Sequence, residues 1–333
     1  MNSNCSVLLA YSSSILLKLS ISYSLLFSCI GLPLFMWASV KLWTGFYTRR
    51  FHRNFRLIIQ VHLFGFMLHC SGRIVLHSLD LFNYIFLQPC DMIPNIYRCF
   101  IFRLMYNWGF WITHCTAISL IIERYAATRL MGKYENKFNW LGICLVLAQP
   151  CLAGVPLFFA YINIRFDGVF MPYCSVYNPG SPTIANFNSG VAIGCQIVAR
   201  ILFGFLFTVN KNRRIRMQTS SLSTRFQLEE NKMTMQCLSI YANLSSVFLF
   251  VQIFSFSYLL SISPDMPTEN YLAWMEFNQQ FPAYGIFSVL LIVYKIRLLR
   301  SKINTNLNQQ VHLNETETYF GILEMQIRNI ERH

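Results

Sequence analysis

Residues 99–125 read CFIFRLMYNWGFWITHCTAISLIIERY, a mainly apolar stretch that begins with a cysteine and ends with the triplet Glu123-Arg124-Tyr125. An α-helix rises 1.5 Å per residue, so the 25 residue steps from Cys99 to Arg124 cover about 37 Å. The hydrocarbon core of a bilayer is only about 30 Å thick. The stretch is therefore predicted to be a membrane-spanning helix with Cys99 and Arg124 near its two ends.

Six further apolar segments of similar length are spread along the chain. A 54% share of hydrophobic residues and a 12% share of charged residues also exclude an ordinary cytosolic enzyme, since soluble proteins carry about 25% charged residues. We therefore predict an all-α membrane protein, a seven-transmembrane helix bundle. The predicted spans are residues 19–42, 56–79, 99–123, 139–162, 187–209, 234–262 and 279–298.

The predicted domain organisation is a short N-terminus, one membrane domain and a tail. Residues 1–18 are expected to be extracellular, residues 19–300 to form the seven-helix domain, and residues 301–333 to form a polar, disordered cytoplasmic tail. The first span has no basic segment before it and no small-residue cleavage site after it, so we expect an uncleaved signal anchor. The spans 56–79 and 279–298 are the most polar, and their polar side chains should face the protein interior.

The basic residues indicate the orientation of the chain. The net charge is +13, and 21 of the 27 Lys and Arg residues fall on the side that holds the tail, against four on the other side. Cytoplasmic loops are enriched in Lys and Arg, so the C-terminus is predicted inside and the N-terminus outside. The basic excess is thereby explained as a topology signal, and no nucleic-acid partner is expected.

Four of the eleven cysteines, Cys5, Cys90, Cys99 and Cys174, fall on the predicted outer face, where disulfides persist. Four cysteines allow three pairings, and the sequence does not choose among them. We favour Cys99 with Cys174 and keep Cys5–Cys90 as a second candidate, with Cys90 as an alternative partner of Cys174. The sequence Asn4-Cys5-Ser6 predicts glycosylation of Asn4 on the same face.

The triplet Glu123-Arg124-Tyr125 ends a span at the predicted cytoplasmic boundary. An acid beside an arginine can pair locally and later release the planar guanidinium to the carbonyls or carboxylates of a partner. The alternative is a plain interfacial anchor, in which Arg124 snorkels and Tyr125 joins the aromatic belt. The position of the triplet opposite Cys99 favours the first interpretation.

These features resemble the G-protein-coupled receptors with seven helices, and more narrowly the nematode serpentine chemoreceptors of the alpha and alpha/beta classes. The resemblance implies a chemoreceptor in the plasma membrane of a sensory cilium, with a small odorant or pheromone-like ligand and a heterotrimeric G protein as partners. It does not extend to the sodium site or the Asn-Pro-x-x-Tyr ending of rhodopsin-like receptors. The residues that carry the resemblance are 97–99, Glu123–Thr128, Tyr134-Glu135, Cys174 and Leu222–Asn231.

Polar residues inside spans are the candidates for ligand binding. Residues 103, 107, 111 and 114 follow one another at spacings of four, four and three, which places them on one helix face. Interhelical hydrogen bonding that only holds the bundle together is the alternative role for such residues. The predicted ligand-binding residues are Arg103, Asn107, Trp111, His114, Gln280 and Tyr284.

The sequence therefore predicts a receptor that binds a small molecule in the outer half of the bundle and activates a G protein through Glu123, Arg124 and Tyr125. The rival hypothesis is a transporter or channel with a polar path past Arg73 and Arg200. Transporters commonly carry internal repeats, which this sequence lacks. A membrane enzyme is the weakest alternative, because His-Glu-x-x-His and phosphate-binding motifs are absent, and no metal or other cofactor is expected.

Overall fold

The computed structural model describes residues 3–44, 51–92, 96–130, 139–162, 173–174, 182–216 and 222–298, together with 301 and 305. The chain divides into two units, Met1–Val289 and Leu290–His333, and every contact discussed below lies within the first unit. The described residues form helices and connecting segments, with no β-strand among them. Nearly all of the predicted tail, 301–333, lies outside the described residues.

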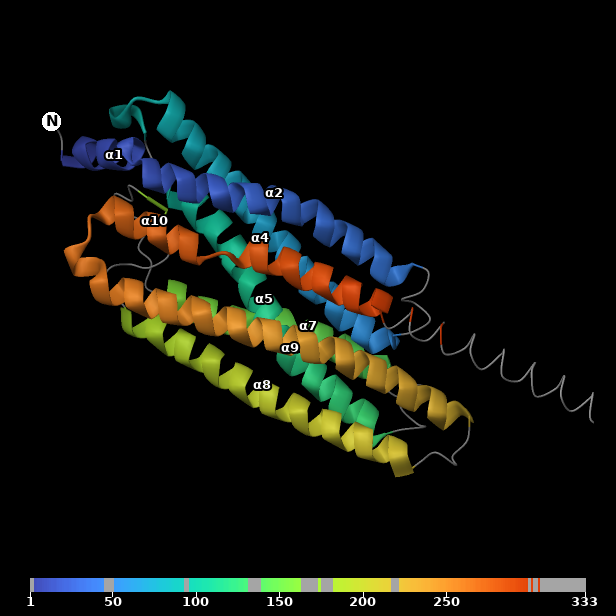
Figure 1. Ribbon diagram of the computed structural model, residues 1–333. Coiled ribbons are helices and arrows are strands. Elements are labelled where there is room, and N and C mark those ends of the chain that lie inside the picture. The colour runs from blue at the N-terminus through green and yellow to red at the C-terminus, as the bar shows by residue number, and fades with distance from the viewer. Residues whose placement is uncertain are drawn as a thin grey trace, which may run out of the picture. The chain divides into compact units, whose positions relative to one another are not determined.

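Each of the seven predicted spans lies within a helix, to within two residues at its ends. The short helix α1, Ser3–Ser13, comes first, and a helix over residues 281–298 comes last (Figure 1). Two 3₁₀ turns, η1 (Pro89–Asp91) and η2 (Ser263–Asp265), lie in the connections. The long helices are α2 (Ile15–Trp43), α4 (Arg53–Phe86), α5 (Ile96–Arg129), α7 (Asn139–Tyr161), α8 (Pro182–Arg216) and α9 (Leu222–Ile262), followed by the shorter α10 (Thr268–Asn278).

Six helical segments in the described part of the chain are long and apolar enough to cross a membrane. They include the segment Thr268–Leu298, which combines α10 with the helix 281–298. The 34-residue α5 is not among the six, although it is long enough. It packs against α4, α7, α8 and α9, so protein surrounds much of its surface and its polar side chains need not face lipid (Figure 1).

Glycines bring α4 and α5 unusually close together. A Cβ atom on Gly109 of α5 would lie 2.3 Å from the carbonyl oxygen of Gly65 on α4 and 2.7 Å from the backbone nitrogen of His69. On α4, a Cβ atom on Gly72 would lie 3.0 Å from the carbonyl oxygen of Phe102. Small residues at a helix crossing allow this backbone approach and the dispersion contacts that hold membrane helices together.

The expectation that the polar residues of span 56–79 face inward is confirmed. His62, His69, Arg73 and His77 are all at most 6% exposed. Phe66 of the same helix stacks between Phe35 of α2 and Phe281, with ring centroids 4.8 and 4.7 Å away. The inner face of α4 is thus mixed, with aromatic rings and polar groups side by side.

Two disulfides lie at one end of the unit, which we call the disulfide end. Cys5 of α1 is bonded to Cys90 of η1, and Cys99 of α5 is bonded to Cys174. Tyr11 of α1 packs with Leu17, Ile21, Tyr173 and Leu272 in one buried apolar group. Asn4 lies in the first turn of α1, and its side chain is outside the described part of the chain. Covalent bonds and packing therefore hold α1 and the segment 173–174 against the helices.

Candidate functional site

A cavity of about 100 Å³ lies between α4, α5, α7, α8, α9 and α10. Its apolar lining includes Phe110, Trp111, Leu157, Phe256 and Phe281. Its polar lining is uncharged apart from the titratable imidazole of His69, because none of the described lining residues is an Asp, Glu, Lys or Arg. The polar side chains that line it are His69, Asn107, Tyr161, Asn188, Ser189, Gln252, Asn278 and Gln279.

Several of these polar groups are held by hydrogen bonds that position them at the cavity wall. Asn107 Nδ2 donates to the Tyr161 hydroxyl at 2.9 Å, and Asn278 Nδ2 donates to the carbonyl oxygen of Gln252 at 3.1 Å. His69 Nδ1 lies 2.8 Å from the carbonyl oxygen of Tyr106, so Nδ1 must carry the proton of this hydrogen bond. In the neutral ring Nε2 is then an acceptor, and it is buried without a hydrogen-bond partner in the structure.

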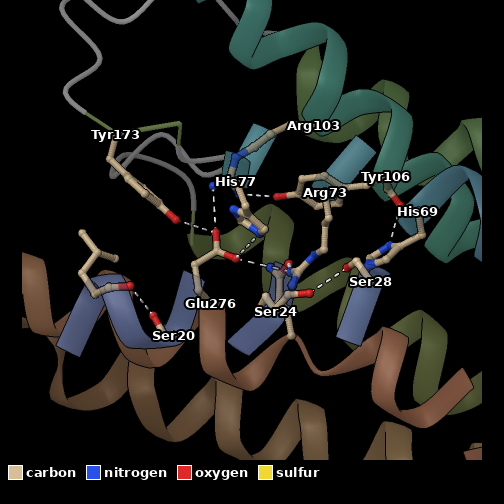
Figure 2. A network of polar contacts seen from close by, with 12 residues as sticks. Ser20, Ser24, Ser28, His69, Arg73, His77, Arg103, Tyr106, Tyr173 and Glu276 are labelled. Carbon is tan, nitrogen blue, oxygen red and sulfur yellow. Dashed lines mark hydrogen bonds and ion pairs between the residues drawn. The ribbon is translucent and has the colours of Figure 1, made fainter. Parts of the chain in front are cut away.

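A group of buried charges lies beside the cavity, at the disulfide end. We call it the arginine–glutamate cluster and define it as Arg73, His77, Arg103, Tyr173 and Glu276 (Figure 2). Arg103 Nη2 donates to Glu276 Oε1 at 2.9 Å, and Arg73 Nη2 lies 3.4 Å from Glu276 Oε2. His77 Nε2 lies 3.6 Å from the same Oε2 atom. Side chains of α4 and α5 thus surround one carboxylate, which belongs to Glu276 of α10.

Tyr173 joins the segment after α7 to this cluster. Its hydroxyl donates to Glu276 Oε1 at 2.8 Å, and its ring lies edge-on to Tyr11. Burial, and next the Glu276 carboxylate, raise the pKa of Tyr173 well above its ordinary value, so the hydroxyl keeps its proton and remains a donor. The neighbouring Cys174 is bonded to Cys99, which fixes the position of Tyr173 above the cluster.

The predicted ligand-binding residues separate into three groups in the structure. Asn107 and Trp111 line the cavity, whereas Arg103 belongs to the arginine–glutamate cluster. The His114 ring packs against Phe110, with centroids 4.3 Å apart, and Gln280 accepts a hydrogen bond from the Tyr23 hydroxyl at 3.4 Å. Tyr284 is buried and stacks on Phe248 with ring centroids 4.3 Å apart. His114, Gln280 and Tyr284 are not among the cavity-lining residues.

Glu276 was not among the predicted site residues. The signal that could have identified Glu276 is the need of buried Arg73 and Arg103 for a counter-charge, because an unpaired buried guanidinium is costly. Glu276 is the acidic residue directly before the predicted seventh span, one helical turn from Gln279-Gln280. The sequence nevertheless offers no direct way to see that α4, α5 and α10 meet at this point.

A second polar group lies at the other end of α5, where Arg124 forms a bidentate contact with Glu123 through Nε and Nη2. Arg124 Nη1 also donates to Asn231 Oδ1 of α9 at 2.9 Å, and both members of the Glu123–Arg124 pair are at most 2% exposed. Nearby, Asn210 of α8 donates to the Thr128 hydroxyl at 2.9 Å. Tyr125 is exposed. This end of α5 is therefore linked to α8 and α9, and the pair is buried.

The two arginines of the rival transporter hypothesis lie in different environments. Arg73 is fully buried in the arginine–glutamate cluster, whereas Arg200 is on the exposed side of α8. They do not share one internal polar path. The described residues instead form a helical membrane protein with a small cavity at the disulfide end and a buried acid–arginine pair at the opposite end of α5.

The chain belongs to the family described as serpentine type 7TM GPCR receptor class ab chemoreceptors, whose model matches residues 2–328. This is a receptor family, not an enzyme family. The match includes all seven predicted spans, both disulfides and the Glu123-Arg124-Tyr125 triplet. The prediction of a serpentine receptor of the alpha or alpha/beta class is confirmed.

Two proteins of Caenorhabditis elegans are similar to this chain. Serpentine receptor class alpha/beta-14 is 26% identical over 203 residues, which cover 57% of this chain and 50% of that protein. Serpentine receptor class alpha-39 is 25% identical over 179 residues, which cover 50% of this chain and 44% of that protein. The matched part of the chain thus spans about half the length of each of these curated relatives.

Proposed function

We propose that the protein is a chemosensory G-protein-coupled receptor of the plasma membrane. It binds a small odorant or pheromone-like molecule in the cavity and activates a heterotrimeric G protein through the Glu123–Arg124 end of α5. The observation that carries this proposal is the arrangement of α5 itself. One helix contributes Asn107 and Trp111 to the cavity and the pair Glu123–Arg124 to the opposite end of the bundle.

The proposed orientation puts the disulfide end and the N-terminus outside and the C-terminus in the cytoplasm. The Lys and Arg asymmetry and the position of both disulfides at one end support it. A ligand would then reach the cavity from the extracellular side, and Arg124 would face the G protein. The family further supports a position in the membrane of a sensory cilium.

The proposed switch is the hydrogen bond from Arg124 to Asn231. In the resting state Glu123 and Asn231 hold the guanidinium between α5 and α9. Separation of these two helices would release Arg124 to backbone carbonyls or carboxylates of the G protein, which suit its planar donors. The receptor is thus in equilibrium between a closed state, in which α5 and α9 are joined through Arg124, and an open state, in which they are separated. A ligand shifts this equilibrium only if it binds the open state more tightly than the closed state.

The decisive experiment is ligand-dependent nucleotide exchange on a purified G protein, in membranes that contain the purified chain. The proposal predicts that a ligand found by screening accelerates exchange, and that Asn107→Ala and Trp111→Ala raise the concentration needed without changing surface expression. The matched control is Trp140→Ala, an exposed tryptophan outside the cavity. A ligand that is transported across vesicles without any effect on exchange would support the rival hypothesis instead.

A further inference from the structure

The arginine–glutamate cluster contains more positive than negative charge. Arg73 and Arg103 are both buried, and both direct donors at the single carboxylate of Glu276. The remaining acid of this region, Asp80, interacts with Arg103 and lies 3.7 Å from Arg98, so three arginines here face two carboxylates. His77 can only add positive charge. Among the described residues, the cluster therefore has one positive charge without a counter-ion.

Arg73 carries the unused hydrogen-bonding capacity. Its side chain is 0% exposed, yet Nε and Nη1 have no hydrogen-bond partner within the described part of the chain. These two nitrogens bear three of the five N–H donors of a guanidinium. The Tyr106 ring lies 5.2 Å from Arg73 Cζ, which supplies a cation–π contact but no acceptor for an N–H group. Buried donors without acceptors are costly, so the site favours a group that supplies oxygen atoms and negative charge.

Gln279 connects Arg73 with the cavity. Its Oε1 atom accepts from Arg73 Nη2 at 2.7 Å, and the same side chain lines the cavity. Gln279 follows the last residue of α10 with φ −83° and ψ 53°, at the interruption before the helix 281–298. The neutral amide oxygen of Gln279 thus occupies a position where a carboxylate oxygen would form a stronger, charge-assisted hydrogen bond.

We propose that the cavity binds a small organic acid, whose carboxylate replaces the Gln279 amide and accepts from Arg73 through both Nη2 and the unpartnered Nη1. The inference rests on the proposed function, because it takes the cavity to be the receptor's ligand site. The aromatic residues Phe110, Trp111 and Phe281 receive the apolar body of the acid, and the cavity volume of about 100 Å³ favours a small ligand. Displacement of Gln279 acts directly at the interruption between α10 and the next helix.

Thermal unfolding of the purified full chain in lipid nanodiscs tests this proposal. The probes are sodium benzoate and benzamide, which share a ring and differ in charge, in a constant background of sodium chloride. Benzoate should raise the melting temperature with saturation, and benzamide should do so much less. Arg73→Gln should raise the half-saturating benzoate concentration about tenfold or more, whereas Arg53→Gln, at an exposed arginine at the start of α4, should leave it unchanged.

Two further variants keep the test decisive if Arg73→Gln does not fold. Gln279→Glu places a tethered carboxylate next to Arg73, so the variant should melt at a higher temperature than the wild type and lose its response to benzoate. Glu276→Gln leaves a second arginine without a counter-ion, so it should melt at a lower temperature and bind benzoate more tightly. An unchanged benzoate response in both variants would overturn the proposal.

A chloride titration separates the organic acid from a simple anion, and the nucleotide-exchange assay separates the organic-acid site from the receptor function. If a chloride titration alone raises the melting temperature and benzoate adds nothing, the site binds an inorganic ion and the proposal is wrong. These unfolding experiments contain no G protein. Benzoate binding without nucleotide exchange would count against the proposed function only, whereas exchange driven by neutral molecules alone would count against the organic-acid site only.

Discussion

Glu276 is the side chain that organises the disulfide end at the scale of single residues. Its Oε1 atom accepts from Arg103 and Tyr173, whereas its Oε2 atom accepts from Arg73 and lies within ion-pair distance of His77. Four partners from α4, α5 and the segment at Tyr173 depend on this one carboxylate. Removing one member of a buried charge group is expensive, because the remaining charges lose their compensation.

Tyr173→Phe should destabilise the protein while it preserves the packing of the ring against Tyr11. The variant removes a donor to a buried carboxylate, a loss worth about 1 to 3 kcal/mol. The measurement is thermal unfolding of the purified chain. Tyr258→Phe is the matched control, because Tyr258 is 65% exposed. Equal melting temperatures for both variants and the wild type would show that the Tyr173 hydroxyl does not stabilise Glu276.

Glu123→Gln and Arg124→Ala should change signalling in opposite directions. Without the Glu123 charge the guanidinium of Arg124 is held more weakly, so basal activity should rise, by about tenfold if the pair contributes about 1.4 kcal/mol. Arg124→Ala removes the group proposed to meet the G protein, so stimulated activity should fall while ligand affinity is kept.

Signalling per receptor at the surface distinguishes this from an anchoring role. Basal and stimulated nucleotide exchange are measured for both variants and normalised to surface receptor number. Asn231→Ala should also raise basal activity, but less than Glu123→Gln does, because it removes only the acceptor on α9. If the normalised activities of wild type and variants are equal, the buried pair has no signalling function.

At the scale of elements, the crossing of α4 and α5 is limited by backbone contact. Gly109→Ala would place a methyl group 2.3 Å from the carbonyl oxygen of Gly65 and 2.7 Å from the His69 nitrogen. Both neighbours are backbone atoms that cannot rotate away, so the helices must separate, at a cost of about 1 to 3 kcal/mol or more. Lower surface expression and a lower melting temperature are expected. Gly154→Ala on α7 should show neither, because its Cβ atom would meet nothing within 4 Å.

The disulfide between Cys99 and Cys174 should be required to keep Tyr173 over the cluster. It closes a loop of 75 residues, which is worth about 4 kcal/mol in the chain-entropy description. Cys99→Ser should free the Cys174 thiol for a membrane-impermeant maleimide and lower surface delivery. Cys144→Ser, at an exposed free cysteine of α7, serves as the control. Normal surface delivery of Cys99→Ser and Cys174→Ser, with no newly reactive thiol in either, would contradict this.

At the scale of the whole molecule, the proposed orientation makes a prediction that is independent of ligand and G protein. Since 21 basic residues fall on the tail side and four on the other, an epitope inserted after Asn308 should be detected only in permeabilised cells. An epitope placed before Cys5 should be detected in intact cells. The reverse labelling pattern would show that the bundle has the opposite orientation, with Arg124 on the extracellular face.

The sequence by itself determined the number and approximate bounds of the spans, because apolar length is a local property that the bilayer thickness converts directly into helices. Local patterns also singled out Arg103, Asn107 and Trp111, and the pair Glu123–Arg124. The interruption at Gln279 and Gln280 could likewise be read from polar residues and a proline inside an apolar span.

Only the tertiary structure decided which of these residues meet. Glu276 and Arg73 are 203 positions apart in the chain, and Arg124 and Asn231 are 107 positions apart. Such contacts depend on how each helix is rotated and on how closely α4 and α5 approach at Gly65 and Gly109. Helical periodicity determines which residues share a face, but the packing of neighbouring helices determines what that face contacts. For that reason Gln279, and not the adjacent Gln280, joins Arg73 to the cavity.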